Sequence, residues 1–165
     1  MRKILVGIIL YNPEISRLEE NVSAIINQSE KVLLIDNASV NIKEIVQFSE
    51  LYENVELIKN NSNLGIARAI NQVLEYSLEH GYEWFLTLDQ DSVCSPDIMK
   101  YYEKYLEYEN VAQLTCNIID RKTGSLTSHN NSSEFSECNG CITSGALNNT
   151  KALFSVGGGY RRIIH

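Results

Sequence analysis

Hydrophobic residues follow two alternating patterns along this chain. Residues 3–10, 32–35, 55–58 and 84–88 are short runs that are apolar at nearly every position. Between and after these runs, apolar residues recur at helical spacing. The four sets are Ile15/Leu18/Val22/Ile25/Ile26, Ile42/Ile45/Val46/Leu51, Ile66/Ile70/Val73/Leu74/Leu78 and Ile98/Met99/Tyr102/Tyr105/Leu106. Apolar strands separated by helices of this length predict an α/β fold with a mainly parallel sheet, covered on both faces.

Polar residues, proline and glycine predict where some of these helices begin and end. Asn63 is expected to cap the third helix, and Pro96 stands where the fourth helix is expected to start. His80 and Gly81 are expected at the carboxyl end of the third helix. Residues 117–139 are rich in Ser, Thr, Asn and Gly, and they are expected to form a loop or an irregular strand.

Length and charge restrict the class of protein. A chain of 165 residues suits one domain, and its net charge of −7 gives no basic surface for nucleic acid. No apolar run is long enough to span a bilayer. Arg2 and Lys3 precede an apolar run, but residues 11–14 (YNPE) offer no signal-peptide cleavage site. We therefore expect a cytoplasmic protein, and a position at the inner face of the membrane is compatible with this.

The chain has four cysteines, Cys94, Cys116, Cys138 and Cys141. The spacing of Cys138 and Cys141 is that of a redox pair or of half a zinc site. No second pair and no suitably spaced histidine completes a zinc site. We therefore expect reduced thiols with a structural role, as is usual in the cytosol.

Polar residues follow each of the four predicted strands. The groups are Tyr11–Asn12, residues 36–39, residues 60–65 and Asp89–Asp91. Each group has a structural alternative, because Asp and Asn also favour turns and helix caps. In an open parallel sheet, however, ligands bind beyond the carboxyl ends of the strands. Asp89 and Asp91 could hold a divalent cation there and leave coordination positions for phosphate oxygens.

Five segments resemble the family 2 glycosyltransferases with the GT-A fold, and most of all the bacterial rhamnosyltransferase type. They are residues 6–13 (VGIILYNP), 32–39 (VLLIDNAS), 60–71 (NNSNLGIARAIN), 84–92 (WFLTLDQDS) and 142–147 (ITSGAL). The resemblance covers essentially the whole chain. It implies a Rossmann-like sandwich in which residues 1–115 form the nucleotide-sugar-binding subdomain. Residues 116–165 would then begin an acceptor-binding subdomain that is incomplete.

The resemblance also implies a set of site residues. Those for the nucleotide sugar are Tyr11, Asn12, Asp36, Asn37, Ser39, Asn63, Gly65, Arg68, Asp89, Gln90 and Asp91. Asp36 would accept the imide N–H of uracil or thymine, and Arg68 would face the diphosphate. Asp91, together with Asp89, would bind Mg²⁺ or Mn²⁺ that bridges the diphosphate. The implied acceptor-side residues are Thr143, Ser144 and Gly145.

The end of the chain departs from the family pattern. In the family, a Val-Gly-Gly-aromatic segment leads to acidic residues, one of which is the general base for the acceptor hydroxyl. Here residues 156–160 (VGGGY) are followed by RRIIH, and the last acidic residue is Glu137. We therefore expect the base to lie beyond His165 and the chain to be truncated before it. Glu134, Glu137 and His165 are the alternatives within the chain.

The expected function is inverting transfer of a sugar, rhamnose from dTDP-rhamnose, to a cell-surface glycan in polysaccharide biosynthesis. The expected partners are a dTDP- or UDP-sugar and a glycan acceptor, and exposed apolar surface could also produce a homodimer. The alternative is a non-catalytic nucleotide-sugar-binding fragment. A dinucleotide-dependent oxidoreductase is disfavoured, because Tyr11-Asn12-Pro13 and not G-x-G-x-x-G follows the first strand. A sugar nucleotidyltransferase is disfavoured because no Gly-rich turn with Arg or Lys follows that strand.

Overall fold

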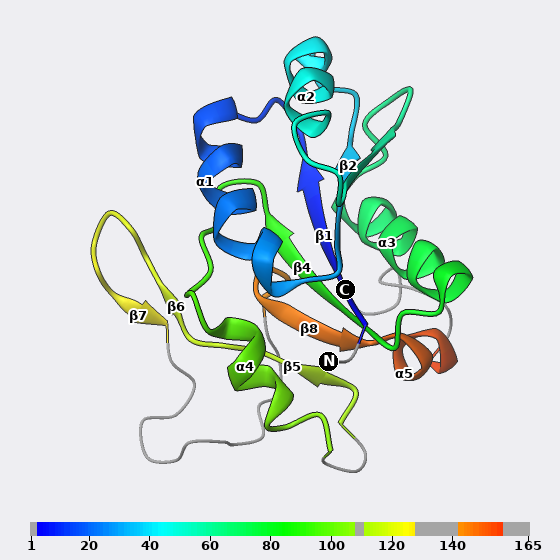
Figure 1. Ribbon diagram of the computed structural model, residues 1–165, viewed down its shortest axis with the longest axis vertical. Helices are drawn as coiled ribbons and strands as arrows, with labels where there is room; N and C mark the ends of the chain where they lie inside the picture. Colours follow the sequence, from blue (N-terminus) through cyan, green and yellow to red (C-terminus); the bar gives the residue numbers. More distant parts are fainter. Residues whose placement is uncertain (1–2, 108–110, 128–141, 157–165) are drawn as a thin grey trace.

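The computed structural model describes residues 3–107, 111–127 and 142–156. Its centre is a six-stranded sheet in the order β3-β2-β1-β4-β8-β5, and a short hairpin, β6–β7, stands apart from it (Figure 1). The strands are β1 (Ile4–Leu10), β2 (Lys31–Asp36), β3 (Val55–Lys59), β4 (Trp84–Asp89), β5 (Gln113–Leu114), β6 (Ile118–Ile119), β7 (Leu126–Thr127) and β8 (Ala146–Asn149).

The first four strands are parallel, whereas β8 is antiparallel to both β4 and β5. The expected α/β class with a mainly parallel sheet is thus confirmed. β8 lies between β4 and β5, so residues from both sides of position 115 build one sheet. The division into two subdomains at that position stays a prediction.

Helices cover both faces of the sheet. They are α1 (Ile15–Ile25), α2 (Ile42–Ser49), α3 (Ile66–His80), α4 (Ile98–Glu103) and α5 (Thr150–Ser155), with a short 3₁₀ helix, η1 (Ile26–Gln28), after α1. Alternate residues of β1 point to opposite faces. Ile4, Val6, Ile8 and Leu10 belong to the hydrophobic core shared with α1, α2 and α4. Leu5 belongs to the core shared with α3 and α5.

The contact between α3 and the sheet is close at Gly7. A Cβ atom at this position would lie 2.5 Å from Val73 Cγ2 and 2.6 Å from Val73 Cγ1. Glycine is therefore required here for packing, because a larger side chain would push α3 away from β1.

The structure confirms some of the expected helix ends and corrects others. Gly81 has φ +73° and forms the left-handed cap of α3, as expected. The expectation for Asn63 was wrong, because Gly65 occupies the N-cap position and α3 begins at Ile66. Leu51 was expected on the apolar face of α2, but α2 ends at Ser49 and Leu51 is 73% exposed. Helix periodicity extended past the true end because nothing in the local pattern marked the turn.

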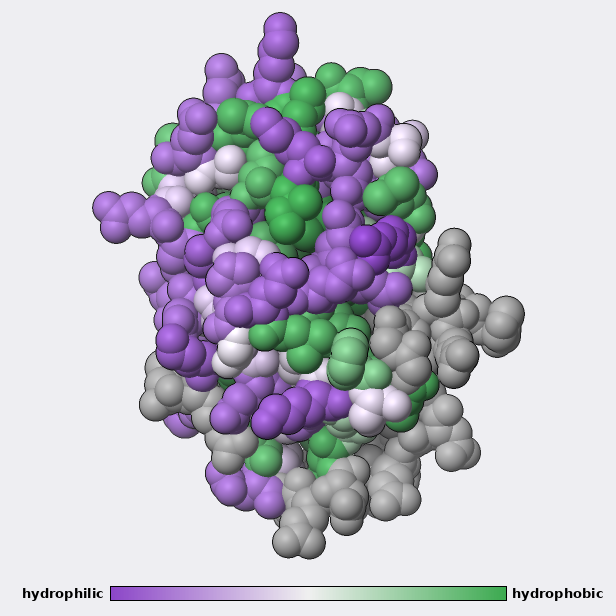
Figure 2. All heavy atoms as spheres, turned by 90° about the vertical axis from the view of Figure 1, so that its right-hand side faces the viewer, coloured by the Kyte–Doolittle hydropathy of each residue, from purple (hydrophilic) through white to green (hydrophobic). Residues whose placement is uncertain are grey.

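The outer surface on the α3 side is mainly hydrophilic, with hydrophobic side chains in separate groups (Figure 2). In the part of the chain that the structure describes, no helix is both long and apolar enough to cross a membrane. The expected homodimer, cytoplasmic location and position at the membrane stay predictions.

Candidate nucleotide-sugar site

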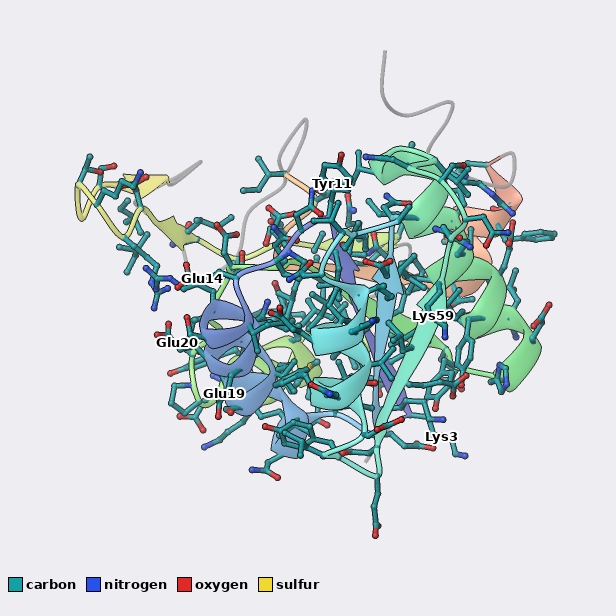
Figure 3. All side chains as sticks on the ribbon, turned by 90° about the horizontal axis from the view of Figure 1, so that it is seen from above. Lys3, Tyr11, Glu14, Glu19, Glu20 and Lys59 are labelled. Atoms are coloured by element: carbon teal, nitrogen blue, oxygen red, sulfur yellow. The ribbon has the colours of Figure 1, made fainter. Side chains whose placement is uncertain are left out.

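The register of the sheet brings two acidic strand ends to opposite sides of β1. Leu10 of β1 is paired with Asp36 of β2, and Ile9 is paired with Asp89 of β4. Asp36 and Asp89 are therefore about two strand spacings, roughly 10 Å, apart along the carboxyl edge of the sheet. Figure 3 looks down on this edge, where Tyr11 and Glu14 label the loop after β1 and Lys59 labels the end of β3.

The loops after β1 and β2 are interlocked around Asp36. Asp36 as a residue is 1% exposed, and its two carboxylate oxygens accept the Ser39 N–H at 3.3 and 3.2 Å. Ser39 Oγ in turn accepts the Asn12 N–H at 2.8 Å. Asn12 Oδ1 accepts the Val40 N–H at 2.8 Å, so each loop holds the other. Asn12 and Ala38 have positive φ angles, 50° and 65°.

The loop after β3 is joined to this pair through Asn37. Asn37 Oδ1 accepts the Asn60 side-chain N–H at 3.0 Å, and Asn60 exchanges two further hydrogen bonds with Gln72 of α3. Three loops at the edge of the sheet are thereby tied together by amide side chains. Such neutral hydrogen bonds fix the loops without adding charge near a ligand.

Two expected ligand residues make other contacts in the structure. Asn63 Oδ1 accepts the Gly65 N–H at 2.9 Å, and Gly65 has φ +80°. The Arg68 guanidinium pairs with the Glu75 carboxylate on the exposed face of α3. Surface pairs of this kind are weak, so a diphosphate could compete for Arg68.

The Asp89–Asp91 loop is held by side chains from distant parts of the chain. Asn21 of α1, which is fully buried, donates from Nδ2 to the Asp89 carbonyl at 2.7 Å. The Asp89 N–H donates to Ser144 Oγ at 3.1 Å, and Ser144 Oγ also lies 2.7 Å from Ser92 Oγ. The position of Asp89 is thus fixed at both its amide and its carbonyl group.

The electrostatics of this loop suit a bound cation. Partial burial raises the pKa of Asp89, the negative charge of Asp91 raises it further, and a hydrogen bond with Ser144 opposes the rise. A divalent cation between the two carboxylates would remove this repulsion. Within the described ranges, no group of three or more His, Cys, Asp or Glu residues could hold a metal. Two carboxylates fit Mg²⁺ or Mn²⁺ when water and phosphate oxygens complete the coordination.

A cleft of about 1060 Å³ opens beside the same loop. Six of the expected site residues line it, namely Asn12, Asp89, Gln90, Asp91, Ser144 and Gly145. The other expected residues, including Asp36 and Arg68, lie outside this cleft. Thr143 is also outside the cleft lining, and its carbonyl oxygen accepts a hydrogen bond from Thr87 Oγ1. The cleft thus extends from the Asp89–Asp91 loop toward the expected acceptor side.

The cleft also contains residues that sequence reasoning missed. Glu14 places a carboxylate at its wall, and this carboxylate accepts the Ser16 hydroxyl at 2.7 Å. The Asp120 carboxylate accepts hydrogen bonds within its own turn. Asn21 was missed as well. The available signal was a polar residue between Leu18 and Val22 on the apolar face of a helix.

The expected cysteine thiols and alternative bases are only partly within the described residues. Cys94 and Cys116 are free thiols, and both line the cleft, which was not expected. Burial raises the pKa of Cys94 to about 12. Cys138 and Cys141 lie outside the described residues. So do the alternative bases Glu134, Glu137 and His165.

Comparison with known sequences gives a family match. The profile of Glycosyl transferase family 2 matches residues 5–160. A dTDP-rhamnosyl transferase from Shigella flexneri, RfbF, is 33% identical over 115 residues. The alignment covers 69% of this chain and 38% of RfbF.

Comparison with solved structures gives the same fold. The S. aureus TarS structure of residues 1–349 in complex with UDP-GlcNAc has a TM-score of 0.69 and 18% identity, covering 93% of this chain and 47% of that one. Glucosyl-3-phosphoglycerate synthase from Mycobacterium tuberculosis, crystallised with Mn²⁺, UDP and glucosyl-3-phosphoglycerate, has a TM-score of 0.51 and 16% identity. That match covers 69% of this chain and 43% of the synthase. The expected GT-A fold is confirmed, and the chain spans less than half the length of each of these relatives.

Proposed function

Because this chain belongs to Glycosyl transferase family 2, we propose that it binds a nucleotide sugar for inverting transfer to a glycan acceptor. dTDP-rhamnose is the proposed donor, since RfbF is named as a dTDP-rhamnosyl transferase. A UDP-sugar is the closest chemical alternative, because uracil and thymine share the same imide group. The alternative of a binding unit without transfer activity has the same donor site and differs only in the acceptor chemistry.

The observation that carries this proposal is the position of Asp36 and of the Asp89–Asp91 loop on the two sides of the end of β1. Asp36 is buried, and its carboxylate is held in place by the Ser39 N–H. A group that recognises a base through one hydrogen bond needs such a fixed position. The other two carboxylates are more exposed and repel one another, as suits groups that share a cation. A nucleoside diphosphate laid across β1 would meet both kinds of group.

Each residue would then have a distinct role. Asp36 would accept the imide N–H of the base, and Tyr11, whose side chain is half-exposed, would cover one face of the ring. Asn12 and Ser39 would hold the loops that frame the base. Asp89 and Asp91 would hold Mg²⁺ or Mn²⁺. The cation would supply charge stabilisation for the departing nucleoside diphosphate.

The acceptor would enter by the cleft that lies beside the Asp89–Asp91 loop. Ser144 and Gly145 line that cleft and are anchored to β4, since the Gly145 N–H donates to the Thr87 carbonyl at 2.8 Å. A group that removes the proton of the acceptor hydroxyl must lie within hydrogen-bond reach of it. Outside the proposed cation site, Glu14 and Asp120 are the carboxylates in the described cleft wall, and each already accepts hydrogen bonds from neighbouring residues.

The test is a titration of dTDP by calorimetry, with Mn²⁺ and with EDTA. We expect Mn²⁺ to tighten binding by roughly tenfold or more, equal to about 1.4 kcal/mol or more. Asp91→Asn should abolish most of this difference, because an amide keeps the shape but lacks the charge that the cation requires. Asp97→Asn, an exposed change outside the site, is the matched control. Equal affinity with and without Mn²⁺ in the unmodified chain would refute the cation site.

A further inference from the structure

The side chain of Gln90 is paired with the main chain of Tyr11. The Tyr11 N–H donates to Gln90 Oε1 at 2.8 Å, and Gln90 Nε2 donates to the Tyr11 carbonyl at 3.3 Å. The amide of the side chain thus binds the backbone of a single residue through both its donor and its acceptor, as one strand binds another. The two residues are 79 positions apart in the sequence.

This pair stands between the two halves of the proposed donor site. Gln90 is flanked by Asp89 and Asp91, so its backbone belongs to the proposed cation loop. Tyr11 is followed by Asn12, whose N–H donates to Ser39 Oγ. The Ser39 N–H in turn donates to Asp36. Hydrogen bonds joined by the Tyr11–Asn12 peptide bond and by Ser39 therefore connect Asp36 to the Asp89–Asp91 loop, and Gln90 supplies the side-chain link between the loops after β4 and β1.

The hydrogen bonds of Gln90 leave it little capacity to bind a ligand directly. Its carbonyl oxygen is directed at the Tyr11 N–H, and one of its two N–H groups is used by the Tyr11 carbonyl. The backbone that it holds leads into Asn12, which has φ 50°. Uncommon backbone conformations of this kind persist only where the surroundings fix them.

We propose that Gln90 is a positioning residue that couples base recognition to cation binding. In this role it makes the loop after β1 adopt its binding conformation only when the Asp89–Asp91 loop is also in place. This inference rests on the proposed function for the identity of the ligands, and on the Tyr11–Gln90 pair for the coupling itself. By linkage, a ligand bound at one loop then tightens binding at the other.

The first experiment needs no nucleotide. Mg²⁺ is titrated into isotope-labelled protein, and the backbone amide signals of Tyr11, Asn12 and Val40 are followed by NMR. We expect these signals to shift on addition of Mg²⁺ in the unmodified chain and to stay in place in Gln90→Met. Methionine keeps the length of the side chain but cannot form the pair. The Tyr11 amide should also exchange with solvent faster in Gln90→Met, whereas the exposed change Gln47→Met should alter neither property.

The second experiment measures the coupling between ligands. Thymidine lacks phosphate groups, so any effect of Mg²⁺ on its affinity must be carried by the protein. We expect Mg²⁺ to tighten thymidine binding by about fivefold, the lower end of common coupling energies. Gln90→Met should remove this factor and weaken dTDP binding by about tenfold, the loss expected for two hydrogen bonds. Gln90→Glu, which keeps the acceptor but not the donor, should restore part of the coupling.

The outcomes separate this inference from the proposed function. Unchanged coupling and unchanged Tyr11 exchange in Gln90→Met would overturn the role of Gln90 while leaving the proposed function intact. Failure of the unmodified chain to bind dTDP, with normal Mg²⁺ responses at Tyr11 and Asn12, would refute the proposed function. The same result would support the link that Gln90 makes between the loops.

Discussion

At the scale of single residues, the proposed donor site contains strained backbone. Asn12 and Ala38 both have positive φ, and only Asn tolerates this conformation at little cost. For alanine it costs about 1–2 kcal/mol, because Cβ approaches the following carbonyl oxygen. The hydrogen bonds between Ser39, Asn12 and Val40 hold Ala38 in this conformation. The strain is therefore located in the loop that presents Asp36.

Replacing Ala38 by glycine should release this strain. We expect Ala38→Gly to raise the free energy of unfolding by about 0.5–1 kcal/mol, since glycine adopts positive φ freely but makes the unfolded chain more flexible. Ala24→Gly, in α1, is the matched control and should lower it by a similar amount. Urea denaturation measures both changes. If Ala38→Gly destabilised the protein as much as Ala24→Gly does, the backbone at Ala38 would not be strained.

At the scale of secondary structure elements, β2, β3 and α3 are joined by a polar cluster far from the site. Lys31 Nζ lies 2.7 Å from Glu56 Oε2, and the Tyr76 hydroxyl donates to the same oxygen at 2.7 Å. The hydrogen bond with Glu56 raises the pKa of Lys31 to about 12. Burial alone would raise the pKa of Glu56, but its hydrogen bonds with Lys31 and Tyr76 outweigh burial and lower it.

This cluster predicts a pH-dependent contribution to stability. A lowered pKa in the folded state means that the Glu56 contribution is present above its ordinary value of 4.5 and is lost as pH falls through the folded value. We expect Glu56→Gln to cost about 0.5–1 kcal/mol at pH 7, a small amount because the pair is partly exposed. The difference from the unmodified chain should shrink as pH is lowered below 4.5. Because the pKa of Lys31 is raised from 10.5 to about 12 in the folded state, its contribution to stability is fully present below pH 10.5 and is lost as pH rises toward 12.

Thermal unfolding of both proteins across this pH range measures the effect. Glu79→Gln, near the end of the same helix that carries Tyr76, is the control and should show no such trend. A cost for Glu56→Gln that stays constant from pH 7 to pH 3 would contradict the assignment.

Strands and helices with a clear pattern of apolar residues were predictable from the sequence. Short strands that depend on pairing with a distant strand were not. β1 to β4 are continuous apolar runs, and α1 to α3 carry clear apolar faces, so local patterns indicated all seven. β5 and β8 are short, and they exist because β8 pairs with both β4 and β5. No local pattern reports a partner that lies dozens of residues away. The hairpin of β6 and β7 fell within a segment that was expected to be loop or irregular strand, for the same reason.

At the scale of the whole molecule, binding across the sheet edge should stabilise the entire fold. A ligand at about 100 times its Kd adds about 2.7 kcal/mol to the free energy of unfolding. For a chain of this size, that raises the Tm by roughly 5–10 °C. With Mg²⁺ present, we expect dTDP and UDP to produce this shift and GDP and CDP to fall well short of it. Cytosine presents an unprotonated N3 where uracil and thymine present the imide N–H, and guanine presents its N1–H from a larger two-ring base, so neither places a donor on the buried Asp36 as a uracil or thymine ring would.

Differential scanning fluorimetry with each nucleotide at one concentration measures this selectivity. Asp36→Asn, which can donate as well as accept, should reduce the difference among the four nucleotides. Equal Tm shifts with GDP and dTDP in the unmodified chain would remove Asp36 from the base pocket.

The site as a whole was partly predictable. Strand ends of a parallel sheet meet at one edge, and this rule was enough to bring Tyr11, Asp36 and Asp89 together from the sequence. The hydrogen bonds that hold the loops of the site in place were not predictable. The bond between Asn21 and the Asp89 carbonyl joins α1 to β4, and that between Gln90 and Tyr11 joins β4 to β1. Such bonds depend on tertiary packing, which no run of neighbouring residues encodes.

The place of β8 in the sheet has a consequence for the order of assembly. Within the described residues β8, at Ala146–Asn149, is the last strand in the sequence, yet it lies between β4 and β5. β5 has its only partner within the described sheet in β8, so it cannot join before β8 arrives. During synthesis, therefore, β4 waits with its outer backbone groups unpaired until residue 149 has left the ribosome. An unprotected edge of this kind can recruit strands from other chains, so we expect the nascent protein to be most prone to aggregation during that interval.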